Sequence, residues 1–200
     1  RSIRTSSFVV FPMMAGLAAV AEPLVRLLLS DKWMPAVPYL QIFCAAYALW
    51  PIHTANLQAM NALGRSDIFL RLEILKKAIG FAILVATVPL GMPAMALGVF
   101  ASGMVASMVN AYPNVKLFGY AVREQASDLF PALALSLVMG AAVAAMPAFR
   151  SDALTILAKG ATGVAIYWAL AKALKLEGYA YIVSTIHELA GRKPRGEGIA

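Results

Sequence analysis

Apolar stretches of about 20 residues follow one another along most of the chain, separated by short polar turns. A helix needs roughly 20 residues to cross the hydrocarbon core of a bilayer, which is about 30 Å thick. Six stretches meet this length, at residues 7–29, 36–62, 68–90, 94–112, 129–149 and 153–174. The predicted fold class is therefore an all-α integral membrane protein with about six transmembrane helices.

The composition argues against an ordinary soluble domain. Hydrophobic residues make up 61% of the chain and charged residues 14%, whereas soluble domains average about 45–50% and about 25%. So few polar side chains cannot coat a soluble core of this size, and lipid is the simplest alternative environment. The single cysteine, Cys44, excludes a disulfide within the chain.

The formal net charge of +7 would suggest nucleic acid as the partner of a soluble protein. In a membrane protein, basic residues gather instead in cytoplasmic segments. If the first residues are cytoplasmic, thirteen of the 17 Lys and Arg residues fall on the cytoplasmic side, and four fall outside. Without Lys76 and Lys77 the bias is still eleven against four. We therefore predict that both ends are cytoplasmic and expect no nucleic-acid partner.

Several local signals shape these helices. Pro51 should kink the span at residues 36–62, because proline removes a backbone donor. The short connection at residues 91–93 forces the third and fourth spans to lie antiparallel. Asp152 is a candidate cap for the last span. Residues 113–127 read as a polar linker, and residues 175–200 as a cytoplasmic tail with an amphipathic helix at 179–189.

The second span has an unusually polar face. Aromatic and polar residues recur along it at helical spacing, at Tyr47, Trp50, Thr54, Gln58 and Asn61, with His53 and Asn56 on the adjoining stripe. Polar groups at membrane depth tend to face a bundle interior or a wet cavity. For a single Asn or Gln, helix–helix hydrogen bonding is the simpler interpretation. For the whole face, we predict a substrate cavity lined by His53, Asn56, Gln58 and Asn61.

Charged residues mark the third span and the first. Glu73 reaches both Lys76 and Lys77 at helical spacing, so one lysine stays without this partner. Arg71, Lys76 and Lys77 are either cavity residues that attract an anionic substrate or a solvated cytoplasmic collar. Glu22 and Arg26 are partners four residues apart, and form either a structural pair or an outer gate.

Motifs of catalysis and of metal binding are missing from the sequence. The two histidines, His53 and His187, fall on different elements, and the sequence holds no pair of histidines four residues apart and no pair of carboxylates at ligand spacing. No nucleophile stands next to a base in a recognisable pattern. We expect neither an enzyme nor a metal or cofactor site within these residues.

Three segments carry a family resemblance. The stretch at residues 32–42 follows the run AEPLVRLLL, and residues 59–67 (AMNALGRSD) precede residues 70–77 (LRLEILKK). In these segments the chain resembles the C-terminal part of bacterial polysaccharide transporters of the MOP flippase superfamily, of the Wzx and WzxC type. The similarity covers residues 1–90, and beyond them only helix pattern and loop lengths agree.

The resemblance implies a two-bundle transporter of about fourteen helices, of which this chain would be the C-terminal part. It implies transport of undecaprenyl-pyrophosphate-linked oligosaccharide across the bacterial inner membrane, for lipopolysaccharide or exopolysaccharide biosynthesis. It also implies basic cavity residues, for which Arg71, Lys76 and Lys77 are the candidates. Membrane lipid and proteins of polysaccharide polymerisation and export are the expected partners.

Other functions remain open. An ion-coupled drug exporter of the same superfamily should bury acidic residues, and here only Glu22 and Glu73 qualify, each with a basic neighbour. A membrane enzyme of lipid-linked glycan assembly, such as a polymerase or acyltransferase, should carry catalytic residues in a large outer loop, but the outer loops are short. A scaffold would not need the polar face of the second span.

Overall fold

The computed structural model describes residues 2–62, 64, 66–118 and 122–191, and in this part of the chain the secondary structure is entirely helical. Nine α-helices and two 3₁₀ turns are found there: α1 (Ser2–Ala19), α2 (Ala21–Leu29), η1 (Asp31–Ala36), α3 (Val37–Ala48), α4 (Trp50–Ala62), α5 (Ser66–Thr87), η2 (Val88–Leu90), α6 (Met92–Phe118), α7 (Val122–Ala144), α8 (Asp152–Ala173) and α9 (Glu177–Gly191).

Three stretches of the described residues are long and apolar enough to cross a membrane: Met92–Ala111, Arg123–Ala144 and Asp152–Ala173. The pair α1 and α2 makes a fourth, if a bent pair counts as one span. Taken singly, α3 and α4 have only 12 and 13 residues, and α5 carries four charged residues within two turns. The all-α membrane class is confirmed, while six as the number of spans stays a prediction.

The stretch predicted as one span at residues 7–29 is bent by 66° between α1 and α2. Pro23 lies in the first turn of α2 and cannot donate a hydrogen bond to the carbonyl of Ala19. The proline ring would also clash with that carbonyl if the helix continued without a bend. Pro12 lies inside α1 without interrupting it, so proline alone did not identify the position of the break.

The second predicted span is likewise divided, at Leu49, between α3 and α4. Pro51 follows two residues later, where the sequence predicts a kink. The backbone N–H group of Leu49 donates a hydrogen bond to the Ala46 carbonyl, and that of Ile52 donates one to the Leu49 carbonyl. Both bonds reach back three residues, which is tighter than the four residues of an α-helix. The interruption places the start of α4, and with it His53, beside α6.

Two helices extend beyond their predicted limits. α6 runs to Phe118 and α7 begins at Val122, so most of the linker predicted at residues 113–127 is helical. Polarity ends a hydrophobic run, but it does not end a helix, because the backbone hydrogen bonds continue outside the hydrocarbon. α9 covers the amphipathic helix predicted at 179–189, and residues 192–200 of the tail lie outside the described residues.

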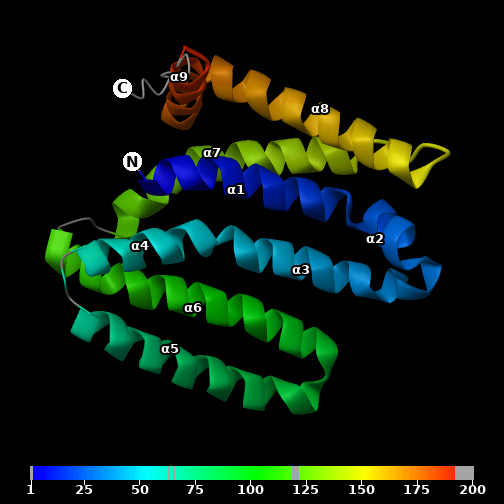
Figure 1. Ribbon diagram of the computed structural model, residues 1–200. Coiled ribbons are helices and arrows are strands. Elements are labelled where there is room, and N and C mark those ends of the chain that lie inside the picture. The colour runs from blue at the N-terminus through cyan, green and yellow to red at the C-terminus, as the bar shows by residue number, and fades with distance from the viewer. Residues whose placement is uncertain (1, 63, 65, 119–121, 192–200) are drawn as a thin grey trace, which may run out of the picture.

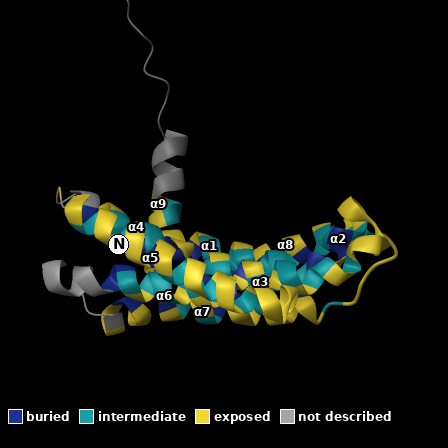
Figure 2. Cartoon of the chain, turned by 90° about the horizontal axis from the view of Figure 1, so that it is seen from below, coloured by how far each residue is buried: buried dark blue, intermediate teal, exposed yellow. Residues whose placement is uncertain are grey.

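The long helices lie side by side, and the chain ends and turns collect at two ends of the bundle (Figure 1). One end, here called the α9 end, holds the beginnings of α1, α5 and α7, the end of α8, and α9. The other, the α2 end, holds α2, η1, Gly91 and the turn at residues 145–151. α9 runs across the long axis of the other helices (Figure 2). Every predicted cytoplasmic turn that is described lies at the α9 end.

The core is built where α1, α7 and α8 meet. Phe8, Met139, Val143 and Tyr167 are buried together there. The Tyr167 hydroxyl donates a 2.9 Å hydrogen bond to the Phe8 carbonyl, which satisfies a polar group inside an apolar cluster. Elsewhere large apolar side chains are exposed along the bundle, as the yellow segments of Figure 2 show. Such surfaces suit lipid or further protein.

Small residues bring α5 and α6 together. A Cβ atom on Gly98 would lie 3.0 Å from the Thr87 methyl carbon and 3.1 Å from a methyl carbon of Ile83. One on Gly80 would lie 3.3 Å from the Ser102 hydroxyl oxygen. Small residues at such contacts let transmembrane helices approach closely. Gly91 makes the turn before α6 with a φ of 88°, which favours glycine.

Candidate functional site

The polar face predicted on the second span is centred on His53, in the first turn of α4. The ring of His53 lies 5.8 Å from that of Trp50, which in turn lies 6.3 Å from that of Tyr47. These rings come from both sides of the break at Leu49. Thr54 does not extend the polar surface, because its hydroxyl bonds back to the Trp50 and Pro51 carbonyls.

His53 is held by Asn110, a fully buried residue of α6. The Asn110 side-chain nitrogen lies 2.7 Å from Nδ1 of His53, and because an amide nitrogen can only donate, Nδ1 accepts this hydrogen bond. The Asn110 Oδ1 atom is buried without a hydrogen-bond partner in the described part of the chain. Burying an amide oxygen in this way is costly and uncommon.

The ion pair of α5 completes this group. Lys76 is buried and forms a salt bridge with Glu73, three residues earlier. α5 packs against both α4 and α6, the helices that carry His53 and Asn110. α4, α5 and α6 therefore bring together four groups, here called the polar cluster: His53, Glu73, Lys76 and Asn110.

Of the polar cluster, His53 lines an open cavity of about 200 Å³ between the α3–α4 break and α6. Tyr47, Trp50 and His53 form one wall, and small residues of α6, including Ser102 and Ser107, form the other. The Ser107 hydroxyl bonds back to the Gly103 carbonyl. An imidazole with one buried partner and one face on a cavity can bind a hydrogen-bonding ligand or exchange a proton.

The remaining predicted cavity residues do not all join the cluster. Gln58, Arg71 and Lys77 are exposed on the surface of the chain. The side chains of Asn56 and Asn61 lie outside the described part of the structure. Of the two lysines that Glu73 could reach, Lys76 takes the partner and Lys77 does not. A substrate cavity formed by these residues stays a prediction.

Asn110 is a residue that the sequence reasoning missed. It stands alone near the end of the apolar run at residues 94–112, and a lone amide at membrane depth is itself a signal of a buried contact. Its partner could not be inferred, because nothing in the spacing of α6 relates Asn110 to His53 on α4.

A network of ion pairs closes the α2 end. Arg26 bonds to Glu22 at 2.9 Å, to Asp31 at 3.1 Å and to Asp152 at 3.3 Å. The predicted Glu22–Arg26 pair is thus present within a larger network that joins α2, η1 and α8. Asp152 faces Arg26 and does not cap its own helix, which begins after Ser151 without a side-chain cap. Thr155 instead donates to the Ser151 carbonyl.

A second network, absent from the sequence predictions, closes the α9 end. Arg4 of α1 contacts Asp128 of α7 at 2.5 Å and also pairs with Glu177 of α9. The three partners lie far apart in the sequence, so spacing alone could not relate them. Among the described residues, no three His, Cys, Asp or Glu side chains gather closely enough to hold a metal ion.

Residues 1–38 match the sequence model of a family described as polysaccharide biosynthesis protein. The match supports a role in polysaccharide biosynthesis. It covers α1, α2, η1 and the first residues of α3, and it includes Glu22, Arg26 and Asp31 of the network at the α2 end. No curated protein and no solved structure matches the chain.

Proposed function

We propose that the chain is the C-terminal part of a transporter that flips undecaprenyl-pyrophosphate-linked oligosaccharide across the bacterial inner membrane. The observation that carries the proposal is a buried polar cluster inside an apolar helical bundle, in a chain whose first 38 residues match polysaccharide biosynthesis proteins. Buried ionisable groups in membrane helices are expensive, and they usually serve a substrate or ion pathway.

In this proposal the transporter belongs to the MOP superfamily, works without a cofactor and catalyses no covalent reaction. The cavity beside His53 is part of the pathway of the polar head group. Lys76 supplies the charge that attracts the pyrophosphate, and Glu73 is its partner when substrate is absent. Both ends of the chain are cytoplasmic, which agrees with the position of α1 and α9 at one end of the bundle. Polymerisation and export proteins of the same glycan are the partners.

The test is complementation by the natural full-length protein in a bacterial strain that cannot export its lipid-linked glycan. We expect Lys76→Ala to reduce surface polysaccharide to about a tenth or less, because the buried charge is removed. Lys77→Ala is the matched control: its side chain is adjacent and exposed, and export should be unchanged. Membrane insertion of each variant is checked by immunoblotting of membrane fractions.

A charge-swapped variant separates substrate contact from a structural role. Glu73→Lys combined with Lys76→Glu keeps a pair at helical spacing, so a purely structural ion pair is retained. If Lys76 contacts the pyrophosphate, the swapped protein inserts but does not export. Restored export in the swapped protein would contradict the role of Lys76. Normal export by a strain lacking the protein would contradict the proposed function itself.

A further inference from the structure

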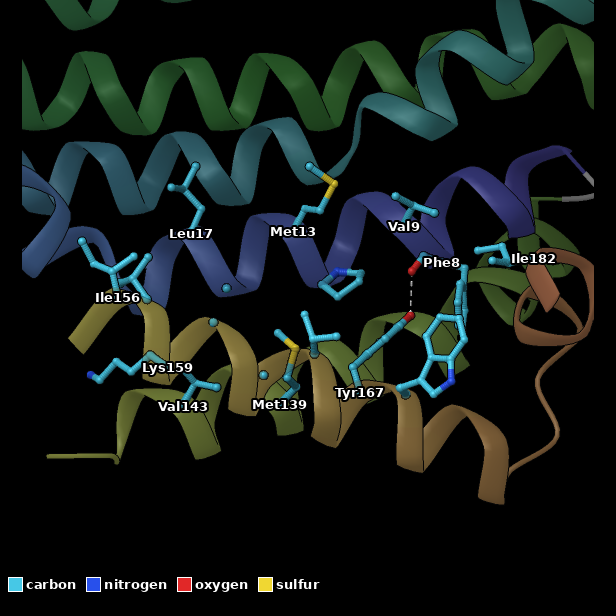
Figure 3. Close-up of a pocket in the computed structure, with 17 residues that line it drawn as sticks. Phe8, Val9, Met13, Leu17, Met139, Val143, Ile156, Lys159, Tyr167 and Ile182 are labelled. Atoms are coloured by element: carbon cyan, nitrogen blue, oxygen red, sulfur yellow. Dashed lines mark hydrogen bonds between the residues drawn. The ribbon is translucent and has the colours of Figure 1, made fainter. Parts of the chain in front are cut away.

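An apolar groove runs along the face of the bundle opposite the polar cluster, between α1 and α8. Both helices pack mainly on α7 and touch each other little, so α7 forms the floor of the groove (Figure 3). Its volume is about 390 Å³. Met139 and Val143 line the floor, and the exposed side chains of Met13 and Val164 show that the groove opens to the surface.

The two ends of the groove differ in chemistry. At the α9 end it is closed by the hydrogen bond between Tyr167 and the Phe8 carbonyl, and by Ile182 of α9. Toward the α2 end lies Lys159, the one charged residue in the lining, whose side chain runs along α8 on the side of Ile156 (Figure 3). Lys159 is 7% exposed, so its stem is part of the apolar wall.

The charge of Lys159 lacks an acidic partner among the described residues. Three carboxylates lie at the α2 end, those of Glu22, Asp31 and Asp152, and each contacts Arg26 instead. A lysine without a counter-ion is expensive at membrane depth unless its ammonium group reaches water or an anion. Lys159 follows Asp152 by seven residues, or about 10 Å of helix. Its flexible stem can bring the charge toward the head-group level.

We propose that this groove binds an anionic glycerophospholipid from the leaflet at the α2 end. One acyl chain lies in the groove along Met139 and Val143, and the lipid phosphate accepts a hydrogen bond from the Lys159 ammonium group. The distance fits: from Ile156 to Trp168 the groove follows twelve residues of α8, about 18 Å, against about 15 Å for half of the hydrocarbon core. A packed protein helix would instead bury the ammonium group without a partner.

The proposal is independent of the transport function, because it concerns a lipid that stays with the protein. It is tested on the purified full-length protein in detergent, with palmitoyl-oleoyl phosphatidylglycerol as the anionic lipid and palmitoyl-oleoyl phosphatidylcholine as the zwitterionic one. Lipid binding is measured by native mass spectrometry, and by the rise in the melting temperature that a bound lipid produces.

Two variants test the two halves of the groove separately. Lys159→Met keeps the apolar wall and removes the charge, so the preference for phosphatidylglycerol over phosphatidylcholine should fall about fivefold, the contribution expected of one lysine at an anionic lipid surface. Gly160→Leu should reduce the binding of both lipids, because its side chain fills the groove. No atom lies within 4 Å of a Cβ built on Gly160, so the fold itself has room for the substitution.

Lys32→Met is the matched control, since it removes one exposed charge from the same end of the molecule and should leave the preference intact. An unchanged preference in Lys159→Met would overturn the proposal, as would unchanged lipid binding in Gly160→Leu. A photocrosslinking residue placed at position 160 gives a further test. Crosslinking to phospholipid in membranes is the expected result, whereas crosslinking to polypeptide would assign the groove to a protein partner and contradict lipid binding.

Discussion

The buried side chain of Asn110 has one polar atom with a hydrogen-bond partner and one polar atom without a partner among the described residues. Its nitrogen donates to His53, while its oxygen has no partner in the described structure. A hydrogen bond between transmembrane helices contributes about 0.6 kcal/mol on average, whereas an unsatisfied buried group costs about 1–3 kcal/mol. The second magnitude is larger, so stability alone does not explain an asparagine here.

We therefore expect Asn110→Leu to keep or slightly raise the melting temperature of the purified protein while it reduces glycan export. Leucine removes the unsatisfied oxygen, and it also frees the His53 ring to turn in its cavity. The measurements are thermal unfolding in detergent and complementation. A fall of many degrees in the melting temperature would show that the oxygen is well paired in the folded protein.

At this scale the sequence predicted the contacts within one helix and missed those between helices. The Glu22–Arg26 pair follows from a spacing of four residues, and a pair between Glu73 and one of the two following lysines follows from spacings of three and four. Such spacings fix the geometry whatever surrounds the helix. Asp31 and Asp152 around Arg26, and Asn110 beside His53, depend on which helices become neighbours. That choice is made by packing of the whole bundle, and a single sequence does not encode it in any local spacing.

At the scale of the helices, the packing of α5 against α6 determines the position of Lys76, because Lys76 lies on α5. Gly98 is so close to Thr87 and Ile83 that an added methyl group must displace one of them. Gly98→Ala should lower stability by about 1–3 kcal/mol, the usual cost of overpacking, and should shift α5 and its ion pair. Gly103→Ala on the same helix is the control, because its nearest neighbour, the Ala46 carbonyl, would lie at an ordinary 3.9 Å.

Thermal unfolding of the two glycine variants compares these effects directly. Alanine favours a helix over glycine by up to about 1 kcal/mol, so Gly103→Ala should be neutral or stabilising. Equal melting temperatures for both variants would mean that α5 and α6 are not tightly packed at Gly98. Gly98 and Ser102 both lie on the face of α6 that packs against α5.

The positions of the helices follow from the apolar runs of the sequence, whereas the positions of their bends depend on packing. The apolar runs locate the helices because a membrane span must be long and apolar, and the described helices follow them. The break at Val20 was not predicted although Pro12 and Pro23 were both visible. Pro12 is accommodated within α1, whereas the chain breaks before Pro23. Which proline bends a helix depends on the neighbours that pack against the freed carbonyl.

For the whole molecule, two ion-pair networks lie at opposite ends, with Arg4 at the α9 end and Arg26 at the α2 end. Most basic residues belong to the α9 end or its predicted turns, and the positive-inside rule therefore predicts that this end is cytoplasmic. This orientation is testable with single cysteines in the full-length protein, after Cys44 and any other native cysteine have been replaced by alanine. Lys32 marks the α2 end and Lys175 the α9 end, and both are exposed.

In intact cells, a membrane-impermeant maleimide should label Lys32→Cys but not Lys175→Cys. Lys175→Cys should be labelled only after the membrane has been permeabilised. Labelling in the opposite order would invert the orientation and place Lys159 with its groove in the cytoplasmic leaflet. Labelling of both sites in intact cells would show that the two ends of the bundle do not lie on opposite sides of the membrane. With the expected order, the lipid bound at Lys159 belongs to the outer leaflet. The cytoplasmic side then carries the Arg4 network that joins α1, α7 and α9.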